Sequence, residues 1–359
     1  MLELERQGLT PESVPEAGRR VLVQRTGNMS TDVTDRVHPD VATVAVLAAK
    51  VVGLDIAGVD VVTPDIGQPL EKVGGAVVEV NAGPSLLMHL NPAKGEPRPV
   101  GRLILDHLFA QQEDGRIPLV GLMGDGDTTR SARLTAWLLQ LQGWHTGLSC
   151  RDGLFVNQRR LHADDPIGFE DAERLLINKQ VQAAVFESDV RHLMTEGLPY
   201  DRCHVGVVTR MPGIRGLEDL YPGEDDRVPG YVRTQIDVVL PGGACVLNAE
   251  DEAVAGLSRY CDGETVYFAA SADHPRIAEH RSQGGRAAFW REGALVLAHG
   301  PQETEVLSVQ RPAVSRLLRE QMLDATDMLV AACAAWVLGM NAELIRAGVK
   351  SYGQSATPH

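Results

Sequence analysis

The sequence predicts an α/β protein built from two units, and three observations support this prediction. The chain has 359 residues, enough for two domains, and its 44% hydrophobic and 23% charged residues are ordinary for a globular protein. From Ile117 onward, strand-like apolar segments alternate with helical periodicity, a pattern typical of a mostly parallel sheet with helices on both faces. A polar stretch over 111–116 reads as a linker. We therefore expect a first unit over 1–113 and a second over 114–359.

The first unit is predicted to contain three strands and two helices. Residues 20–26 alternate in polarity like a strand, and apolar residues recur near helical spacing over 38–53. Two further strand-like stretches cover 53–64 and 74–84, separated by a polar loop, and a helix is expected over 100–110.

The second unit is predicted to alternate strand and helix throughout. The expected strands cover 117–123, 183–188, 203–209, 243–248 and 265–270. The expected helices cover 129–142, 170–180, 250–261 and 322–338. An acidic, proline-bearing stretch over 211–230 is the one long insertion for which we expect irregular structure.

Charge and cysteine usage limit the classes of partner. The formal net charge of −14 argues against a nucleic acid or an anionic membrane, because both require a basic face. The sequence has no apolar run of membrane-spanning length and no signal-peptide core, so we expect a cytoplasmic protein. The five cysteines are scattered without a CxxC motif, which favours free thiols over a metal site or a disulfide framework.

Three oxygen-bearing side chains mark two neighbouring strands of the first unit. Asp60 lies in AGVDVV, and Glu79 and Asn81 lie two apart in VVEVNAGP, so the last two share one face of a strand. Carboxylate and carbonyl oxygens are the ligands that Mg²⁺ prefers. A magnesium site is one interpretation of this pattern, and a pair of solvated strand ends is the other.

The stretch GLMGDGDTTRSARLTAWLLQ, residues 121–140, begins like a phosphate-binding loop. A predicted strand leads into glycines and a Thr-Thr pair, and a predicted helix follows. Gly124, Gly126, Thr128 and Thr129 are the candidate nucleotide contacts. Asp127 stands where such a loop carries a lysine, and its charge would repel a phosphate.

Several segments together resemble the cyanophycin synthetase family. VVGLDIAGVDVVTPDI, VGGAVVEVNAGPSLLMHLNPAKGEPRPVG and NMSTDVTDRVHPD resemble the closing half of that family's ATP-grasp domain. LPYDRCHVGVVT, LPGGACVLNAEDE and AACAAWVLGMNAELIRAGVKSYG resemble, in the same order, the Mur-ligase-like central domain that follows it. The resemblance implies a partial ATP-grasp (α+β) unit over 1–113 and, over 114–359, a Mur-ligase-like domain with a mostly parallel sheet flanked by helices and a degenerate P-loop.

The resemblance also implies a chemistry, its cofactors and its substrates. The family joins a carboxylate to an amine with ATP and Mg²⁺, through an acyl phosphate, and releases ADP; its substrates are aspartate, arginine and the growing cyanophycin chain. By resemblance Asp60, Glu79 and Asn81 match magnesium ligands, and Arg25 matches an arginine that faces phosphate charge. The alternative interpretation is that Arg25 is a surface residue at the edge of a strand. Glu187 matches a metal ligand of the second unit, although a structural role is the alternative.

The chain departs from the family pattern at several positions. The first half of the ATP-grasp domain is expected to be absent before Met1, and the C-terminal Mur domain after about residue 353. The family's glycine-rich continuation after Ser30-Thr31 is replaced by Asp32-Val33-Thr34. The loop at 124–129 is one residue shorter than the family's GTNGKTT-type loop, so we interpret it as a remnant.

Further family positions in the second unit have also changed. Val190, Arg191 and His192 replace the glycines expected after Glu187, and the stretch 210–213 lacks an expected histidine. Asp324 and Asp327 stand where an asparagine pair is expected. His89, His192 and His204 are interpreted as structural or surface histidines.

Two functions are compatible with these observations. In the first, the chain is a truncated or reduced ADP-forming ligase that retains only ATP-grasp chemistry. In the second, it is a catalytically silent paralogue or fragment, a pseudoenzyme that acts as a structural subunit beside a full-length synthetase. We expect a homo-oligomer or association with a full-length homologue, and we favour the second function, with no activity from the isolated chain.

Overall fold

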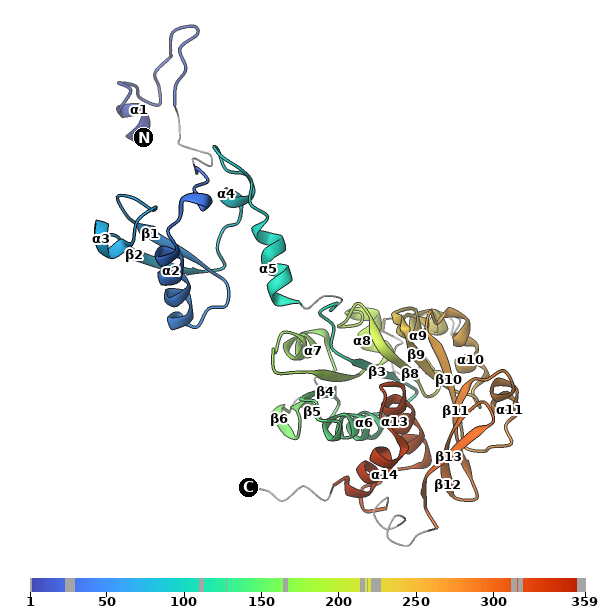
Figure 1. Ribbon diagram of the computed structural model, residues 1–359. Helices are drawn as coiled ribbons and strands as arrows, with labels where there is room; N and C mark the ends of the chain where they lie inside the picture. The colour runs from blue at the N-terminus through green and yellow to red at the C-terminus, as the bar shows by residue number, and fades with distance from the viewer. Residues whose placement is uncertain are drawn as a thin grey trace. The chain divides into compact units, whose positions relative to one another are not determined.

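The computed structural model divides into two compact units, Met1–Arg116 and Ile117–His359, each described here by itself (Figure 1). The structure describes residues 2–22, 30–109, 113–126, 128–163, 167–213, 217, 219–220, 227–310, 315 and 319–353. Among the described helices, none is both long enough and apolar enough to cross a lipid bilayer.

The first unit contains a small antiparallel sheet with one longer helix packed on it (Figure 1). Its described elements are α1 (Leu2–Glu5), η1 (Thr34–Arg36), α2 (Pro39–Val52), β1 (Ala57–Val62), α3 (Leu70–Val73), β2 (Ala76–Ala82), α4 (Leu87–Leu90) and α5 (Val100–Leu108). The helices predicted over 38–53 and 100–110 and the strands predicted over 53–64 and 74–84 correspond to α2, α5, β1 and β2. The strand predicted over 20–26 falls mostly outside the described residues, and its described part, 20–22, is irregular.

Local signals explain where α2 begins and ends. His38 is its N-cap, and the ring Nδ1 accepts a hydrogen bond from the Asp40 amide at 3.2 Å. Pro39 occupies the first helical position, where a missing N–H costs nothing, and Asp40 places negative charge at the positive end of the helix dipole. Gly53 ends the helix in a left-handed conformation, as helix C-termini commonly do.

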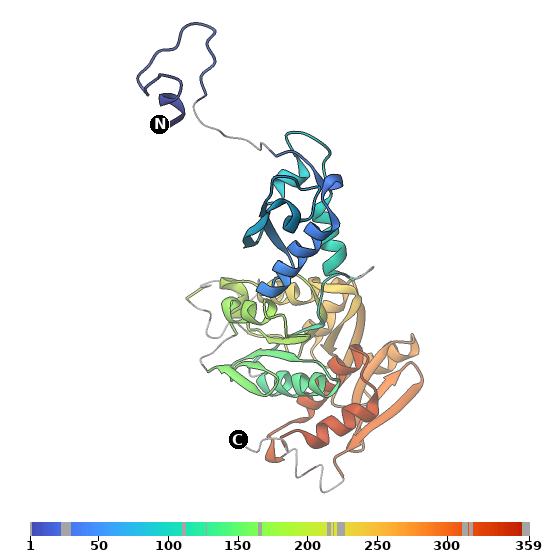
Figure 2. The same ribbon diagram turned by 60° about the vertical axis from the view of Figure 1, so that its left-hand side comes forward.

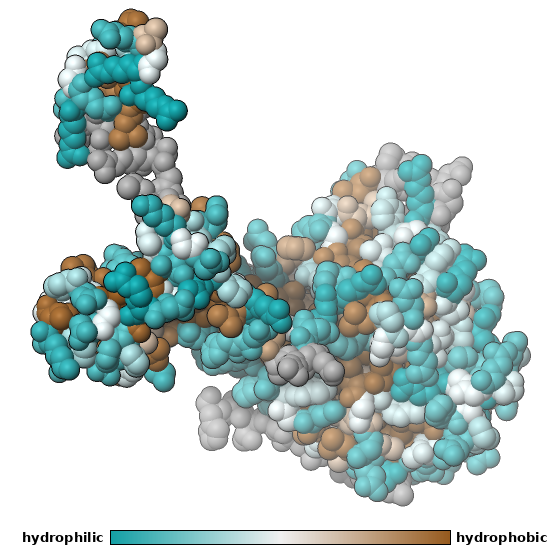
Figure 3. Space-filling view, turned by 45° about the horizontal axis from the view of Figure 1, so that its top comes forward, coloured by the Kyte–Doolittle hydropathy of each residue, from teal (hydrophilic) through white to brown (hydrophobic). Residues whose placement is uncertain are grey.

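The first unit leaves much of its apolar surface uncovered. Among its described residues, the buried hydrophobic side chains are Leu9, Val41 and Leu70. In contrast, Val51 is 78% exposed on α2, and Val62 and Val78 are each 65% exposed on the sheet. Hydrophobic side chains are visible on the surface of this unit in Figure 3. A two-stranded sheet with little buried area is only marginally stable by itself.

The second unit is built on one large mixed sheet (Figures 1 and 2). Its described strands are β3 (Leu119–Met123), β4 (Thr146–Cys150), β5 (Gly153–Val156), β6 (Arg159–His162), β7 (Ala183–Glu187), β8 (Cys203–Val208), β9 (Val239–Asn248), β10 (Glu264–Ala269), β11 (Arg286–Arg291), β12 (Ala294–His299) and β13 (Gln302–Ser308). Its described helices are α6 (Thr129–Leu141), α7 (Phe169–Leu176), α8 (Val190–Thr195), α9 (Val228–Asp237), α10 (Glu252–Ala255), η3 (Gly256–Tyr260), α11 (Pro275–Ser282), α13 (Ala325–Val337) and α14 (Ala342–Ser351).

The predicted parallel sheet is confirmed for the middle of this unit. In the part of the chain that the structure describes, the sheet has 11 strands in the order β13-β12-β11-β10-β9-β8-β3-β7-β4-β5-β6. All neighbours from β11 to β4 pair in parallel, and antiparallel strands extend both ends. Every residue of β3 and of β7 is buried, as expected for central strands that are covered on both faces. The hairpin strands β5, β6, β12 and β13 were not among the predicted elements.

Helix α13 is joined to α6 through a buried carboxylate. Asp324 and Asp327 form a capping box at the start of α13, in which each side chain accepts from the other residue's amide. The Ser131 hydroxyl on α6 donates a hydrogen bond of 2.7 Å to Asp327 Oδ1. Burial raises the pKa of Asp327 above its ordinary value. The two aspartates at the expected asparagine positions therefore hold the helix start and the contact between α6 and α13.

We expect Asp327→Asn to change how the stability of the second unit depends on pH. Because the folded-state pKa of Asp327 is raised, its contribution to the free energy of unfolding is fully present below its unfolded pKa, 3.8, and is lost as the pH rises through the folded pKa. All four tryptophans lie between Trp137 and Trp336, so urea unfolding followed by tryptophan fluorescence reports on this unit. The stability of the wild type relative to the variant should fall as the pH is raised from about 3.5 to 7. A pH-independent difference would show that burial does not control this carboxyl group.

Candidate functional site

The two strands of the first unit place Asp60 and Glu79 directly opposite each other. In the antiparallel ladder Asp60 pairs with Glu79 and Gly58 pairs with Asn81, so all three predicted magnesium ligands point to the same face. The register shifts just after Asp60, where Val61 pairs with Val77. Asp60 and Glu79 are exposed, and Asn81 is half-buried. The structure thus brings together three side chains that the sequence singled out.

This arrangement fits a divalent cation. Like charges directly opposite each other destabilise a sheet, and within the described residues neither carboxylate forms an ion pair. Mg²⁺ commonly uses one or two carboxylates and completes its shell with water and phosphate oxygens. The described residues contain no group of three or more histidine, cysteine or acidic side chains arranged for a metal. A magnesium ion here would therefore use the two carboxylates, the Asn81 carbonyl and non-protein ligands.

Arg25, the residue matched by resemblance to phosphate charge, lies outside the described residues. The nearby Ser-Thr segment is described, and an internal ion pair holds it. Asp32 Oδ2 accepts hydrogen bonds from Arg98 Nε (2.9 Å) and Nη2 (2.6 Å), while Oδ1 accepts from the Thr34 amide (3.2 Å) and hydroxyl (2.6 Å). The Arg98 guanidinium and the Thr34 hydroxyl hold the pKa of Asp32 far below its usual range.

The main chain around Asp32 is fixed as well. The Asp32 amide donates to the Lys94 carbonyl at 2.9 Å, and the amides of Ala93 and Lys94 donate to the Ser30 carbonyl. The resemblance predicted glycines here, whose amides would approach an anion. Here the Asp32 carboxylate already accepts the hydrogen bonds of Thr34 and Arg98, so these groups are committed to the protein itself.

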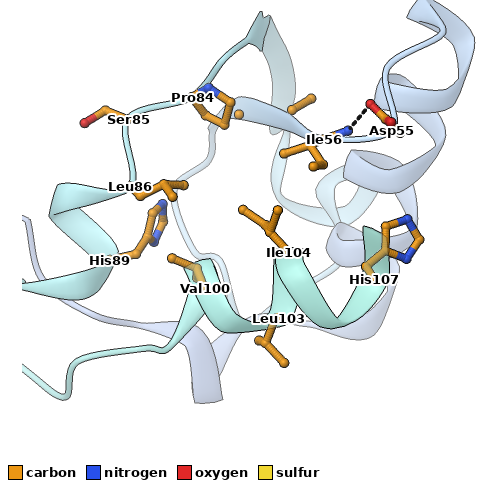
Figure 4. Close-up of a pocket in the computed structure, with 12 residues that line it drawn as sticks. Asp55, Ile56, Pro84, Ser85, Leu86, His89, Val100, Leu103, Ile104 and His107 are labelled. Atoms are coloured by element: carbon orange, nitrogen blue, oxygen red, sulfur yellow. Dashed lines mark hydrogen bonds between the residues drawn. The ribbon is translucent and has the colours of Figure 1, made fainter. Parts of the chain in front are cut away.

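A cavity of about 360 Å³ lies in the first unit between the start of β1, the loop after β2, and helices α4 and α5. Figure 4 shows Ile56 and Ile104 facing each other across it, with His89 and His107 toward its two ends. Asp55 at its rim accepts a hydrogen bond from the Ile56 amide at 3.0 Å. His89, interpreted from the sequence as a structural histidine, lies within the short helix α4 and lines this mainly apolar cavity.

The predicted phosphate-binding loop of the second unit connects β3 to α6. Gly124 is required by a close approach, because a Cβ there would lie 2.0 Å from Thr209 Oγ1. Gly126 has a φ of +90°, which other residues rarely adopt. Thr128 and Thr129 are buried at the start of α6. Asp127, at the expected lysine position, lies outside the described residues.

Glu187 at the end of β7 accepts four hydrogen bonds around this loop. Its Oε1 accepts from the Thr128 amide (3.2 Å) and hydroxyl (2.9 Å), and its Oε2 accepts from the Thr129 hydroxyl (2.9 Å) and the Arg151 amide (3.0 Å). The residue is 1% exposed. A bound phosphate would need the same amide and hydroxyl groups, which already donate to Glu187. This geometry supports the structural role weighed for Glu187.

Arg151 lies near this site and was not predicted from the sequence. Its guanidinium lies 3.8 Å from Glu187 Oε1 and 3.2 Å from Asp189 Oδ2. Asp189 also caps α8 by accepting from the His192 amide, and the His192 ring lies 2.9 Å from it. Burial opposes ionisation of Asp189, but the hydrogen bonds from His192 lower its pKa overall. No sequence signal pointed to Arg151, because it lies in a turn after β4.

Other changed positions have structural partners. Arg191 forms an ion pair with Asp219 at 2.6 Å, and the Met211 amide donates to Asp251 Oδ2 at 2.8 Å. The Leu119 amide donates to His204 Nδ1 at 3.3 Å, which agrees with the structural role expected for that histidine.

The chain is similar over almost its whole length to cyanophycin synthetases. A cyanophycin synthetase from Geminocystis herdmanii is 34% identical over 365 residues, which cover 99% of this chain and 41% of that protein. The glutathione biosynthesis bifunctional protein GshAB of Clostridium perfringens is 37% identical over 111 residues, 30% of this chain and 14% of that protein. Among solved structures, a UDP-N-acetylmuramoyl-L-alanyl-D-glutamate–2,6-diaminopimelate ligase aligns with a TM-score of 0.47 at 12% identity, covering 67% of this chain and 48% of that one. No family model matches the chain.

We expect Glu187→Gln to destabilise the second unit by about 1–3 kcal/mol. Glutamine keeps one acceptor oxygen, but its amide nitrogen would face donors that now bond to the second carboxylate oxygen. The measurement is urea unfolding of the full chain followed by tryptophan fluorescence. Glu173→Gln, on an exposed position of α7, is the matched control and should change stability by less than about 0.5 kcal/mol. Equal effects of the two substitutions would exclude a structural role for Glu187.

Proposed function

We propose that the chain is a ligase-derived protein without ligase turnover of its own, which acts as a structural partner of a full-length synthetase. The chain is homologous over almost its whole length to cyanophycin synthetases and spans about 41% of the length of these relatives. One observation carries the proposal: the Glu187 carboxylate accepts the hydrogen bonds that a nucleotide phosphate would need. The substrates of such an assembly would be aspartate, arginine and the cyanophycin chain, with ATP and Mg²⁺ as cofactors.

Electrostatics support the loss of nucleotide binding from the second unit. A phosphate at the start of α6 would share a buried space with the Glu187 carboxylate, and two close anions repel each other strongly where water is excluded. The exposed Asp125 in the same loop adds negative charge. Displacing Glu187 would also leave a buried carboxylate without partners, which is costly. The start of α6 is therefore proposed as a structural junction.

The uncovered apolar surface of the first unit supports the proposed association. Val51 and Val62 are exposed on α2 and β1, and in the described part of the chain each strand of the small sheet pairs only with the other. Open strand edges and exposed apolar side chains are features of surfaces that bind other chains. A full-length homologue or a second copy of this chain would cover them.

A second function is favoured by the opposed carboxylates. Asp60 and Glu79 would hold Mg²⁺ together with Asn81, and the ion would bridge and neutralise ATP phosphates. Arg25 would face the phosphate charge, by resemblance. The chain would then be a reduced ligase in which only the first unit takes part in amide formation.

We expect no ATP hydrolysis above background from the isolated full chain. The assay measures phosphate release with Mg²⁺ and ATP, with aspartate, arginine, β-aspartyl-arginine or a cyanophycin primer as acceptor. Asp60→Ala and Glu79→Ala separate this chain's activity from contamination, because both alter the proposed magnesium ligands. Phosphate release that is lost in both variants would reject the first function and support the reduced ligase.

We expect the chain to self-associate or to bind a full-length cyanophycin synthetase. Sedimentation velocity measures both, alone and in mixture. Replacing Val51 and Val62 together by lysine should weaken association about tenfold or more, because charge would enter an apolar interface. Ile177→Lys is the matched control, since Ile177 is 72% exposed on the second unit. A chain that remains monomeric at micromolar concentration, with and without the synthetase, would reject the structural role.

A further inference from the structure

Two of the five cysteines lie in contact beside the parallel part of the large sheet. Cys245 is in the middle of β9, and Cys261 follows η3 just before β10. Both side chains pack in the same apolar cluster, and each thiol affects the ionisation of the other. Cys245 Sγ also lies 3.4 Å from Thr265 Oγ1, and Cys261 Sγ lies 3.7 Å from the Glu264 carbonyl oxygen. Because β9 and β10 are paired neighbours, with Cys245 opposite Thr265, the turn before β10 brings Cys261 into the apolar cluster that contains Cys245.

The two thiols differ in reactivity and in access. The hydrogen bond from Cys245, helped by the Gly263 amide, lowers the pKa of Cys261 to about 7. The same hydrogen bond, together with burial, raises the pKa of Cys245. Cys261 is half-buried, whereas Cys245 is fully buried. Thiolate is the nucleophilic form of cysteine, so at neutral pH Cys261 is both the accessible and the reactive member of the pair.

The other three cysteines lack this environment. Burial raises the pKa of each of Cys150, Cys203 and Cys333 to about 12, and all three are buried. Cys203 packs in the same apolar cluster as Cys261, so it is the competing partner for any disulfide. Among the described residues, no group of three or more histidine, cysteine or acidic side chains that could hold a metal ion includes these cysteines.

We propose that Cys261 and Cys245 form a reversible oxidation site at which a peroxide converts the two thiols into a disulfide. The Cys261 thiolate attacks one peroxide oxygen, the O–O bond breaks, and Cys261 becomes a sulfenic acid as hydroxide leaves. The Cys245 sulfur then attacks the Cys261 sulfur; the S–O bond breaks, and water leaves with the Cys245 proton. Two thiols are oxidised, and one hydrogen peroxide is reduced to two waters.

The disulfide would tie β9 covalently to the segment that precedes β10. It closes a short loop over residues 245–261, which contains α10 and η3. A dithiol reductant restores the thiols by exchange, so the modification is reversible. This inference does not rest on nucleotide binding or on the proposed association.

The test treats the reduced full chain with hydrogen peroxide and counts thiols after denaturation. The wild type has five cysteines, and we expect the count to fall by two and to recover with dithiothreitol. Mass spectrometry of a peptic digest should identify a linked pair of peptides that contain Cys245 and Cys261. The oxidation rate should rise with pH around a midpoint near 7, the pKa of Cys261.

Three variants assign the sulfur atoms. Cys261→Ser should abolish the thiol loss, and Cys245→Ala should leave a Cys261 sulfenic acid that a dimedone reagent traps. Cys333→Ala, in the core of α13, is the matched control and should still lose two thiols. A link between Cys203 and Cys261, an unchanged thiol count, or unchanged oxidation of Cys261→Ser would each overturn the proposal. Peptide mapping of the wild type decides the question even where a variant does not fold.

Discussion

The buried carboxylate of Glu187 connects three parts of the second unit, and the structure of the loop between β3 and α6 depends on it. It lies at the end of β7 and accepts hydrogen bonds from Thr128 and Thr129 at the start of α6 and from Arg151 after β4. A buried charge is tolerated only when its hydrogen bonds are satisfied, so all four donors are needed. The positive end of the α6 dipole adds to the same stabilisation. The feature that makes a helix start attractive to phosphate is therefore used here to hold the fold together.

Carboxylates in the first unit fall into two groups. Asp32 resembles Glu187, because Arg98 and Thr34 satisfy it and it fixes a loop. Asp60 and Glu79 are the opposite case: they are exposed, directly opposed, and without an ion-pair partner among the described residues. Groups that the protein satisfies stabilise its structure, and groups that it leaves unsatisfied can bind a ligand. Under the proposed function, ligand binding would thus fall to the first unit, while the large buried core lies in the second.

Sequence periodicity was sufficient for much of the fold. Helix α2 and the parallel strands β3 and β7 were located to within a few residues, because their apolar patterns are long or continuous. The hairpin strands β5 and β6 were missed, since each has four residues and every residue of β6 is exposed. The site contacts were beyond sequence reasoning for a different reason. Glu187 meets Arg151 across 36 positions, and Asp32 meets Arg98 across 66, so only the folded topology brings them together.

Val62 and the Asp60–Glu79 pair of the first unit lie on one face of the small sheet, and this limits how they can act. Val62 lies two residues after Asp60 on β1, and both side chains are exposed on the same face of the strand. A partner that covers Val62 would therefore approach the Asp60–Glu79 pair as well. Excluding water there would strengthen the repulsion between the two carboxylates unless a cation entered with the partner. The proposed association and the proposed magnesium binding at this sheet would for that reason be coupled. A partner that brings a cation or a basic side chain would relieve both the apolar exposure and the opposed charges, whereas an uncharged partner would relieve only the first.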